Sequence, residues 1–127
     1  AVGYRVLLAN PAPGAGVAGS ALPFPYGPSK AGVSDLALGL ARTLGPKIRV
    51  NAVAPGFIEG EWLQKGLGNS YESVRDKKAA EGLLDTVSTP EDIADAILSM
   101  ITCTKVTGHI LTVDTGHTIG PRISSGI

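Results

Sequence analysis

The stretch Tyr26-Gly27-Pro28-Ser29-Lys30-Ala31-Gly32 determines how the rest of this 127-residue chain is organised. Pro23 and Pro25 precede it, and Pro28 lies inside it. Proline is tolerated in the first turn of a helix but not deeper, because it lacks an N–H and clashes with the preceding turn. We therefore predict that a helix begins within residues 25–28.

The apolar residues after this stretch predict a long helix that ends at about Leu44. They recur three and four residues apart, and Gly45-Pro46 is a typical helix end. Other apolar side chains lie around the sides of the same helix, so we expect it to pack on a sheet and on a second body. The spaced positions are Val33, Leu36, Ala37, Leu40 and Leu44, and the lateral ones are Ala31, Leu38 and Ala41.

Tyr26 and Lys30 form a candidate acid/base pair at the start of this helix. Residues four apart lie on the same helical face. A tyrosine hydroxyl has a pKa of about 10, and a neighbouring cation stabilises the phenolate and lowers that pKa toward neutrality. The same spacing also arises by chance between surface or packing residues, so the flanking chain has to decide between the two interpretations.

Apolar runs on either side of the helix predict two parallel strands. Residues 4–9 form the first run, and residues 47–54 form the second, which Pro55-Gly56 ends. A strand, a crossover helix and a strand make a βαβ unit, and ligands of such sheets bind at the carboxyl ends of the strands. We therefore expect the loops after both strands to open at the same edge as Tyr26.

The segment from residue 57 to 87 has a mixed pattern between the second strand and the next helix. Asn69 or Ser70 is expected to cap a helix that runs through Ala80, with the charged residues 75–78 on its solvated face. An insertion of this length at the ligand edge is a candidate lid. An ordinary connecting helix is the alternative.

A second helix and a third strand complete the predicted elements. Thr89-Pro90-Glu91-Asp92 combines a capping hydroxyl, a proline at the first helical position and two acids in the first turn. Residues 109–113 read as a strand. His109 and His117 lie near the ends of that strand and receive no catalytic role. The buried stripe of the helix is expected at Ile93, Ile97, Met100 and Ile101.

Composition limits the classes of function. Eleven basic and eleven acidic residues give a formal net charge of zero, which argues against a nucleic-acid partner and favours a small molecule or a protein as the partner. The only cysteine, Cys103, excludes an internal disulfide and is expected to pack near a helix end. No apolar run approaches the roughly 20 residues that span a bilayer, and no signal peptide opens the chain. We expect one cytoplasmic domain over residues 1–127, with no metal.

Four segments now support a resemblance. They are Tyr-Gly-Pro-Ser-Lys-Ala-Gly at 26–32, Ile-Arg-Val-Asn-Ala-Val-Ala-Pro-Gly at 48–56, Thr-Pro-Glu-Asp-Ile-Ala at 89–94 and Thr-Gly-His-Ile-Leu-Thr-Val-Asp at 107–114. In order and spacing they resemble the C-terminal half of a short-chain dehydrogenase/reductase. The three-residue gap between tyrosine and lysine favours the main branch of that family over the divergent enoyl reductases, which have a wider gap.

The resemblance implies an α/β fold, the C-terminal portion of a Rossmann-type doubly wound parallel sheet with three strands visible. It implies an NAD- or NADP-dependent enzyme that transfers hydride between an alcohol and a ketone, and a homo-oligomer. Tyr26 would be the general acid/base, and Lys30 would lower its pKa and hold the nicotinamide ribose. Pro55, Gly56 and Ile58 would form the loop against the nicotinamide.

Departures from the family pattern leave an alternative open. Pro13 stands where the family has its catalytic serine, with Ser20 too close in sequence to replace it, and Gly60 stands where the family has a threonine. The glycine-rich pyrophosphate loop belongs to a first half, and residues 11–16 do not match Gly-x-Gly-x-x-Gly before a helix. The alternative is a non-catalytic module for oligomerisation or scaffolding. An extended epimerase-type relative is a third reading, which the run at 51–56 disfavours.

Overall fold

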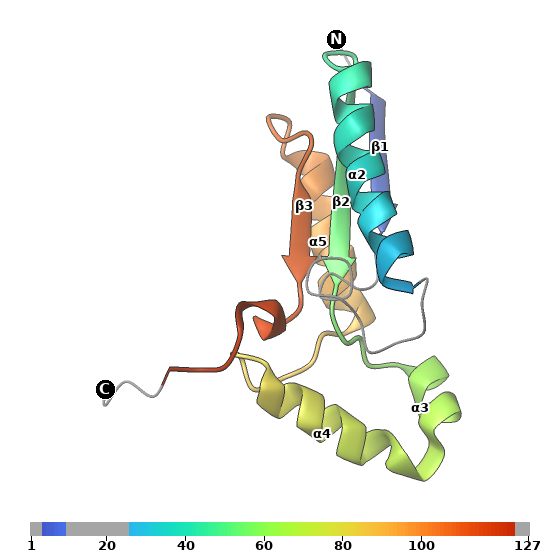
Figure 1. Ribbon diagram of the computed structural model, residues 1–127, viewed down its shortest axis with the longest axis vertical. Helices are drawn as coiled ribbons and strands as arrows, with labels where there is room; N and C mark the ends of the chain where they lie inside the picture. The colour runs from blue at the N-terminus through green and yellow to red at the C-terminus, as the bar shows by residue number, and fades with distance from the viewer. Residues whose placement is uncertain (1–3, 10–25, 124–127) are drawn as a thin grey trace.

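A computed structural model describes residues 4–9 and 26–123 of the protein. Its centre is a three-stranded parallel sheet in the order β1-β2-β3 (Figure 1). The strands are β1 (Tyr4–Ala9), β2 (Ile48–Pro55) and β3 (Ile110–Val113). The α/β class, the parallel sheet and the three strands confirm the sequence predictions; β3 begins one residue later and β2 ends one residue later than expected.

The helix α2 (Tyr26–Leu44) covers one face of this sheet and begins within the predicted window. Its Ala37 is fully buried against Val50 and Ala52 of β2, and these three residues form the centre of the core. The apolar stripe was only partly right, because Leu36 is 53% exposed; Leu38, one of the lateral positions, is 39% exposed. Partly buried residues around this core are Leu40, Ala41, Leu44, Ile48 and Ile110.

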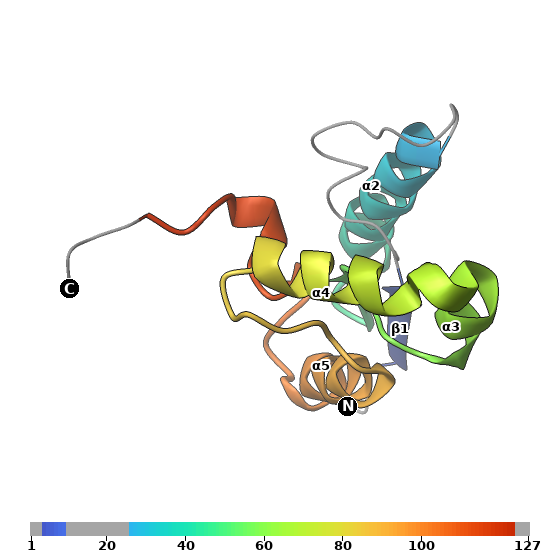
Figure 2. The same cartoon turned by 90° about the horizontal axis from the view of Figure 1, so that it is seen from below.

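The helix α5 (Pro90–Thr102) covers the opposite face, as the view onto the end of the sheet shows (Figure 2). The predicted start is confirmed: the Thr89 hydroxyl accepts a bond from the Asp92 N–H, and the Asp92 carboxylate accepts one from the Thr89 N–H. This reciprocal capping box satisfies two backbone donors of the first turn. In the predicted stripe, only Ile93 is buried, at 8% exposure, and Ile97, Met100 and Ile101 are partly buried.

Arg49 of β2 holds the other end of α5. Its guanidinium donates bonds to the carbonyls of Met100, Ile101, Cys103 and Val106 over 2.8–3.1 Å. These carbonyls lie at or just beyond the helix terminus, where backbone acceptors lack partners inside the helix and a positive charge is favoured. Cys103 ends the helix as predicted, but it is exposed rather than packed.

Residues between β2 and α5 form two helices across the carboxyl ends of the strands (Figures 1 and 2). They are α3 (Glu61–Leu67) and α4 (Tyr71–Glu81), joined by the 3-10 turn η1 (Gly68–Ser70). The sequence predicted α4 but missed α3. Ser70 precedes α4 as expected, yet its side chain makes no capping bond, because η1 continues directly into the helix.

The charged residues 75–78 of α4 are not simply a solvated face. Asp76 and Lys77 are exposed, but Arg75 donates a bond to Glu59 at 2.9 Å and Lys78 donates one to Glu81 at 2.7 Å. In the part of the chain that the structure describes, no helix is long and apolar enough to cross a membrane.

Candidate functional site

Tyr26 and Lys30 both lie at the start of α2, at the end of the sheet where β2 and β3 finish (Figure 1). This placement follows from the βαβ order, because the crossover helix runs antiparallel to the strands that it joins. Tyr26 is the first residue of the helix, and Lys30 lies one turn later and is half-buried. The structure therefore brings the predicted pair to the predicted edge.

The loop after β2 reaches the same edge and packs closely on the loop after β3. Pro55 is buried as the last residue of β2, and the Gly56 N–H donates to the Val113 carbonyl at 2.9 Å. A Cβ added at Gly56 would lie 2.7 Å from Asp114 Cβ, closer than real Cβ contacts come. Glycine is therefore required here for the approach of two protein segments, and its N–H is already committed within the protein.

Ile58 presents free backbone groups in that loop. It forms a parallel bridge with Ser88, in which Phe57 contributes the carbonyl (3.3 Å) and Glu59 contributes the N–H (2.9 Å). Within the described residues, the N–H and carbonyl of Ile58 itself take part in no hydrogen bond. One donor and one acceptor side by side match the two complementary groups of a carboxamide.

Gly60 opens α3 without a side-chain cap. Its backbone is extended, with φ 163° and ψ 164°, and nothing lies within 4 Å of the position that a Cβ would take. A residue with a capping hydroxyl would therefore fit at this position.

The base of α4 is held by the C-terminal part of the chain. The N–H of Leu83 donates to the Thr115 carbonyl at 2.8 Å, and Arg122 donates to the Leu83 carbonyl and to Asp85, both at 2.8 Å. In the middle of α4, the Glu59 carboxylate raises the pKa of Arg75 through the hydrogen bond between them. The insertion between β2 and α5 is thus held to the C-terminal part of the chain after α4, and the pair Glu59–Arg75 joins its first residues to α4.

Asp114 and the turn after β3 form a site that the sequence reasoning did not single out. The Asp114 carboxylate accepts bonds from the N–H groups of Gly116 (3.0 Å) and Thr118 (2.8 Å). Burial favours the neutral acid, but hydrogen bonds from Thr118 and Gly116 and the nearby His117 outweigh it, so the pKa of Asp114 is lowered. The Asp-Thr-Gly triplet after a strand was the available signal.

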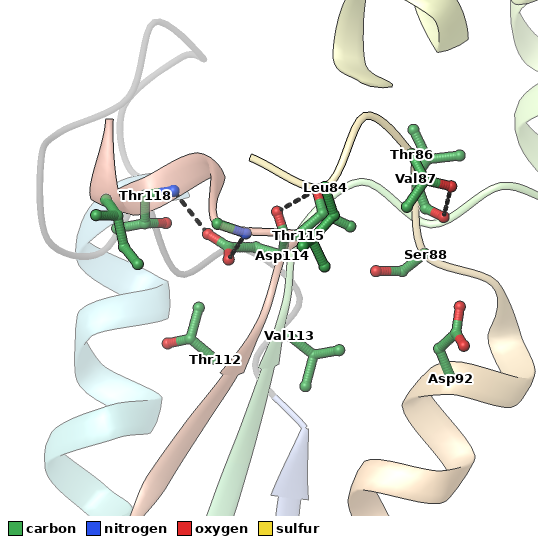
Figure 3. A pocket seen from close by; sticks show the side chains of 12 residues that line it. Leu84, Thr86, Val87, Ser88, Asp92, Thr112, Val113, Asp114, Thr115 and Thr118 are labelled. Atoms are coloured by element: carbon green, nitrogen blue, oxygen red, sulfur yellow. Dashed lines mark hydrogen bonds between the residues drawn. The ribbon is translucent and has the colours of Figure 1, made fainter. Parts of the chain in front are cut away.

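The residues around Asp114 line a cavity of about 610 Å³ between β3, α5 and residues 84–88 (Figure 3). His117, which received no catalytic role, lies 3.8 Å from the Glu81 carboxylate, whose pKa is lowered by its hydrogen bond to Lys78 and by His117. Among the described residues, no group of three or more His, Cys, Asp or Glu side chains is placed to hold a metal ion.

Known proteins match this chain over most of its length. A family model described as enoyl-(acyl carrier protein) reductase matches residues 12–118. The short-chain dehydrogenase/reductase homolog YusR of Bacillus subtilis (strain 168) is 35% identical over 105 residues, which cover 83% of this chain and 78% of that protein. The chain belongs to the short-chain dehydrogenase/reductase family.

Other relatives in this family are longer than the chain. The granaticin polyketide synthase putative ketoacyl reductase 2 of Streptomyces violaceoruber is 38% identical over 99 residues, covering 78% of this chain and 38% of that protein. The MalC reductase/Diels-Alderase of Malbranchea aurantiaca superposes with a TM-score of 0.79 at 28% identity, over 91% of this chain and 43% of that one. ElxO with NADP bound gives a TM-score of 0.73 at 30% identity, over 89% and 46%.

Several family positions can now be placed in the short-chain dehydrogenase/reductase fold. Pro13 and Ser20, the positions that bear on the family's serine, lie outside the described residues. Gly60, at the family's threonine position, is the uncapped start of α3. Tyr26, Lys30 and Ile58 lie at one edge of the sheet, and Gly56 acts there by permitting close packing.

Proposed function

We propose that this chain carries the acid/base residues and the nicotinamide-side loop of an NAD(P)-dependent oxidoreductase. The reaction is hydride transfer between an alcohol and a ketone. The observation that carries the proposal is the position of Tyr26 as the first residue of α2, at the carboxyl edge of a parallel sheet, with Lys30 one turn behind it. Family membership indicates the type of reaction, and the carboxyl edge of the sheet is where we expect it to take place.

Tyr26 serves as the general acid/base at the substrate oxygen. In ketone reduction its hydroxyl gives a proton to the oxygen, and in alcohol oxidation its phenolate takes that proton back. Lys30 stabilises the phenolate through its charge and holds the ribose hydroxyls of the coenzyme. When bound, the nicotinamide coenzyme supplies the carbon that accepts or releases hydride.

The loop after β2 fits the nicotinamide by its backbone chemistry. The N–H and carbonyl of Ile58 are the groups that would hold the carboxamide, since both lack partners among the described residues. Pro55 and Gly56 position this loop, because the close contact between Gly56 and Asp114 fixes its path. Ser88 holds its far side through the bridge to Ile58.

A carbonyl substrate is favoured over an enoyl substrate. The family model carries an enoyl reductase description, whereas the granaticin relative is named a ketoacyl reductase. The three-residue gap between Tyr26 and Lys30 supports the ketone-reducing branch. We place the protein in the cytoplasm as a homo-oligomer, and the exposed Leu36 and Leu38 of α2 support an interface on that helix.

We expect tight binding of the coenzyme only when a glycine-rich first half accompanies these 127 residues. Isothermal titration of the isolated 127 residues with NADH and NADPH is expected to show no micromolar binding, whereas material that also contains such a first half should bind. Micromolar binding by the 127 residues alone would contradict this division of the site.

Tyr26→Phe tests the acid/base role in the longer active protein. We expect kcat for ketone reduction to fall by about 10²–10⁴-fold, while the affinity for NADPH stays largely unchanged. Tyr71→Phe is the matched control, because Tyr71 is also the first residue of a helix but lies in α4. Unchanged turnover in Tyr26→Phe would refute the assignment, and so would an equal loss in both variants.

A further inference from the structure

The cavity beside β3 is distinct from the proposed hydride-transfer site. Its volume of about 610 Å³ falls within the range of small-molecule pockets, roughly 300–1,000 Å³. It lies between residues 84–88, the first turn of α5, the end of β3 and the 3-10 turn η2 (His117–Ile119) (Figure 3). None of the five residues assigned to hydride transfer lines it.

Ser88 supplies a buried hydroxyl that needs a partner. The residue is 3% exposed, and its backbone N–H and carbonyl are used in the bridge to Phe57 and Glu59. Its hydroxyl makes no hydrogen bond to any described residue, and Figure 3 shows it directed away from α5 toward the end of β3. A buried polar group without a partner is unfavourable, so a bound group is expected to complete it.

The charges of the lining select the sign of that group. The cavity is lined by two carboxylates, Asp92 and Asp114, and its lining residues include no Lys, Arg or His. Asp92 uses one oxygen to accept from the Thr89 N–H at 2.8 Å, and Asp114 accepts two backbone N–H groups. A carboxylate offers about four acceptor positions. Both carboxylates can therefore accept further hydrogen bonds from a ligand, and their negative charges would repel an anion.

The remaining lining combines threonines with four apolar side chains, which are Leu84, Val87, Val113 and Ile119. Val87 is buried at 6% exposure, whereas Leu84 and Ile119 are 70% and 83% exposed. Val113, at the end of β3, forms the wall that faces α5 (Figure 3). An occupant with an apolar body gains by covering these side chains.

We propose that this cavity binds a small organic cation, a primary ammonium group attached to a compact apolar body. The ammonium head, with its three donors, lies at the Ser88 hydroxyl, and the Asp92 carboxylate on the same side of the cavity in Figure 3 supplies the opposite charge. The body lies against Val113 and Val87, which are on the same side of the cavity (Figure 3). This ligand site goes beyond the proposed oxidoreductase function and does not depend on it.

The test uses three probes of the same carbon skeleton on the full-length protein without coenzyme: 2-phenylethylammonium, 2-phenylethanol and phenylacetate. Amide chemical shifts of Ser88, Asp92 and Gly116 report binding. We expect saturable shifts with the cation at millimolar concentration, affinity for the alcohol lower by about 10-fold, and no saturation with the carboxylate. Titrating each probe up to roughly 50 mM is enough to detect dissociation constants in the millimolar range.

Two variants assign the binding to named groups. Ser88→Ala should lower the affinity for the ammonium probe by about 5-fold, because one hydrogen bond is lost. Asp92→Asn should lower the affinity for the same probe by about 10-fold or more, because it removes the negative charge. Asparagine keeps an acceptor oxygen for the helix cap, so the helix start should be preserved. Ser99→Ala is the control, because its hydroxyl lies on the exposed side of α5 and bonds to the Ala96 carbonyl.

Three results would overturn the proposal: no saturable binding of the cation, equal affinity for the alcohol or the carboxylate, or undiminished affinity in Ser88→Ala. Thermal unfolding of each variant without probe shows whether it is folded. Repeating the titration in Tyr26→Phe separates the two proposals, since that variant should bind the cation normally whatever its turnover.

Discussion

Replacing Arg49 by methionine should destabilise the protein by about 3 kcal/mol. The guanidinium makes four bonds to backbone carbonyls at the end of α5, three from Nη1 and one from Nη2. A single hydrogen bond to a charged group contributes roughly 1.5–3 kcal/mol, but bonds that share one donor atom are weaker and do not add. Two full bonds at the lower limit give about 3 kcal/mol. Methionine keeps much of the apolar stem of arginine.

Urea unfolding followed by circular dichroism measures this loss. Arg49→Lys should recover only part of the stability, because one ammonium cannot reach all of the carbonyls that the planar fork reaches. Arg42→Met is the matched control, since Arg42 lies exposed in the last turn of α2, and we expect a change of no more than about 0.5 kcal/mol. A loss below about 1 kcal/mol in Arg49→Met would refute the reasoning.

Three further predictions concern the carboxyl edge. Gly56→Ala should destabilise by about 1–3 kcal/mol in urea unfolding, because the new Cβ would overlap Asp114, whereas Gly39→Ala meets no atom within 4 Å and should stabilise by about 0.5–1 kcal/mol. The lowered pKa of Asp114 means that its contribution to stability is present above its unfolded pKa of about 3.9 and is lost as pH falls through the lower folded pKa; a stability–pH curve of Asp114→Asn should lack this part of the acid slope, and an unchanged slope would contradict it. Gly60→Thr adds a capping hydroxyl to α3 and should raise thermal stability by a few tenths of a kcal/mol; a loss would show that the extended backbone does not accept a side chain.

Local signals explain what the sequence predicted well. The prolines before α2 and the Thr89–Asp92 capping box act on neighbouring residues, so spacing alone located both helix starts. The edge that holds Tyr26 and Lys30 followed from the βαβ order. The helix α3 was missed because it is seven residues long, starts at an uncapped glycine and buries none of its residues.

Long-range partners explain what was missed. Arg49 looked like one member of an alternating strand, and its role depends on carbonyls 51 to 57 residues further along the chain. The cavity beside β3 depends on Ser88, whose hydroxyl is unremarkable in sequence and becomes unusual only when the bridge to Ile58 buries it. Residue spacing predicts neither feature, because a local sequence pattern does not show which distant segment will pack against it.

The hydrogen-bond partners of Asn51 are synthesised well after Asn51 itself. Its side chain donates to the Val106 carbonyl and accepts from the His109 N–H, residues 55 and 58 positions later in the chain. At roughly 5–20 residues per second, a ribosome makes these partners about 3 to 12 seconds after Asn51. During that interval β2 has neither its polar partners nor β3. The polar partners of Asn51 therefore become available only after residue 109 has been synthesised, so the packing of β2 is completed late.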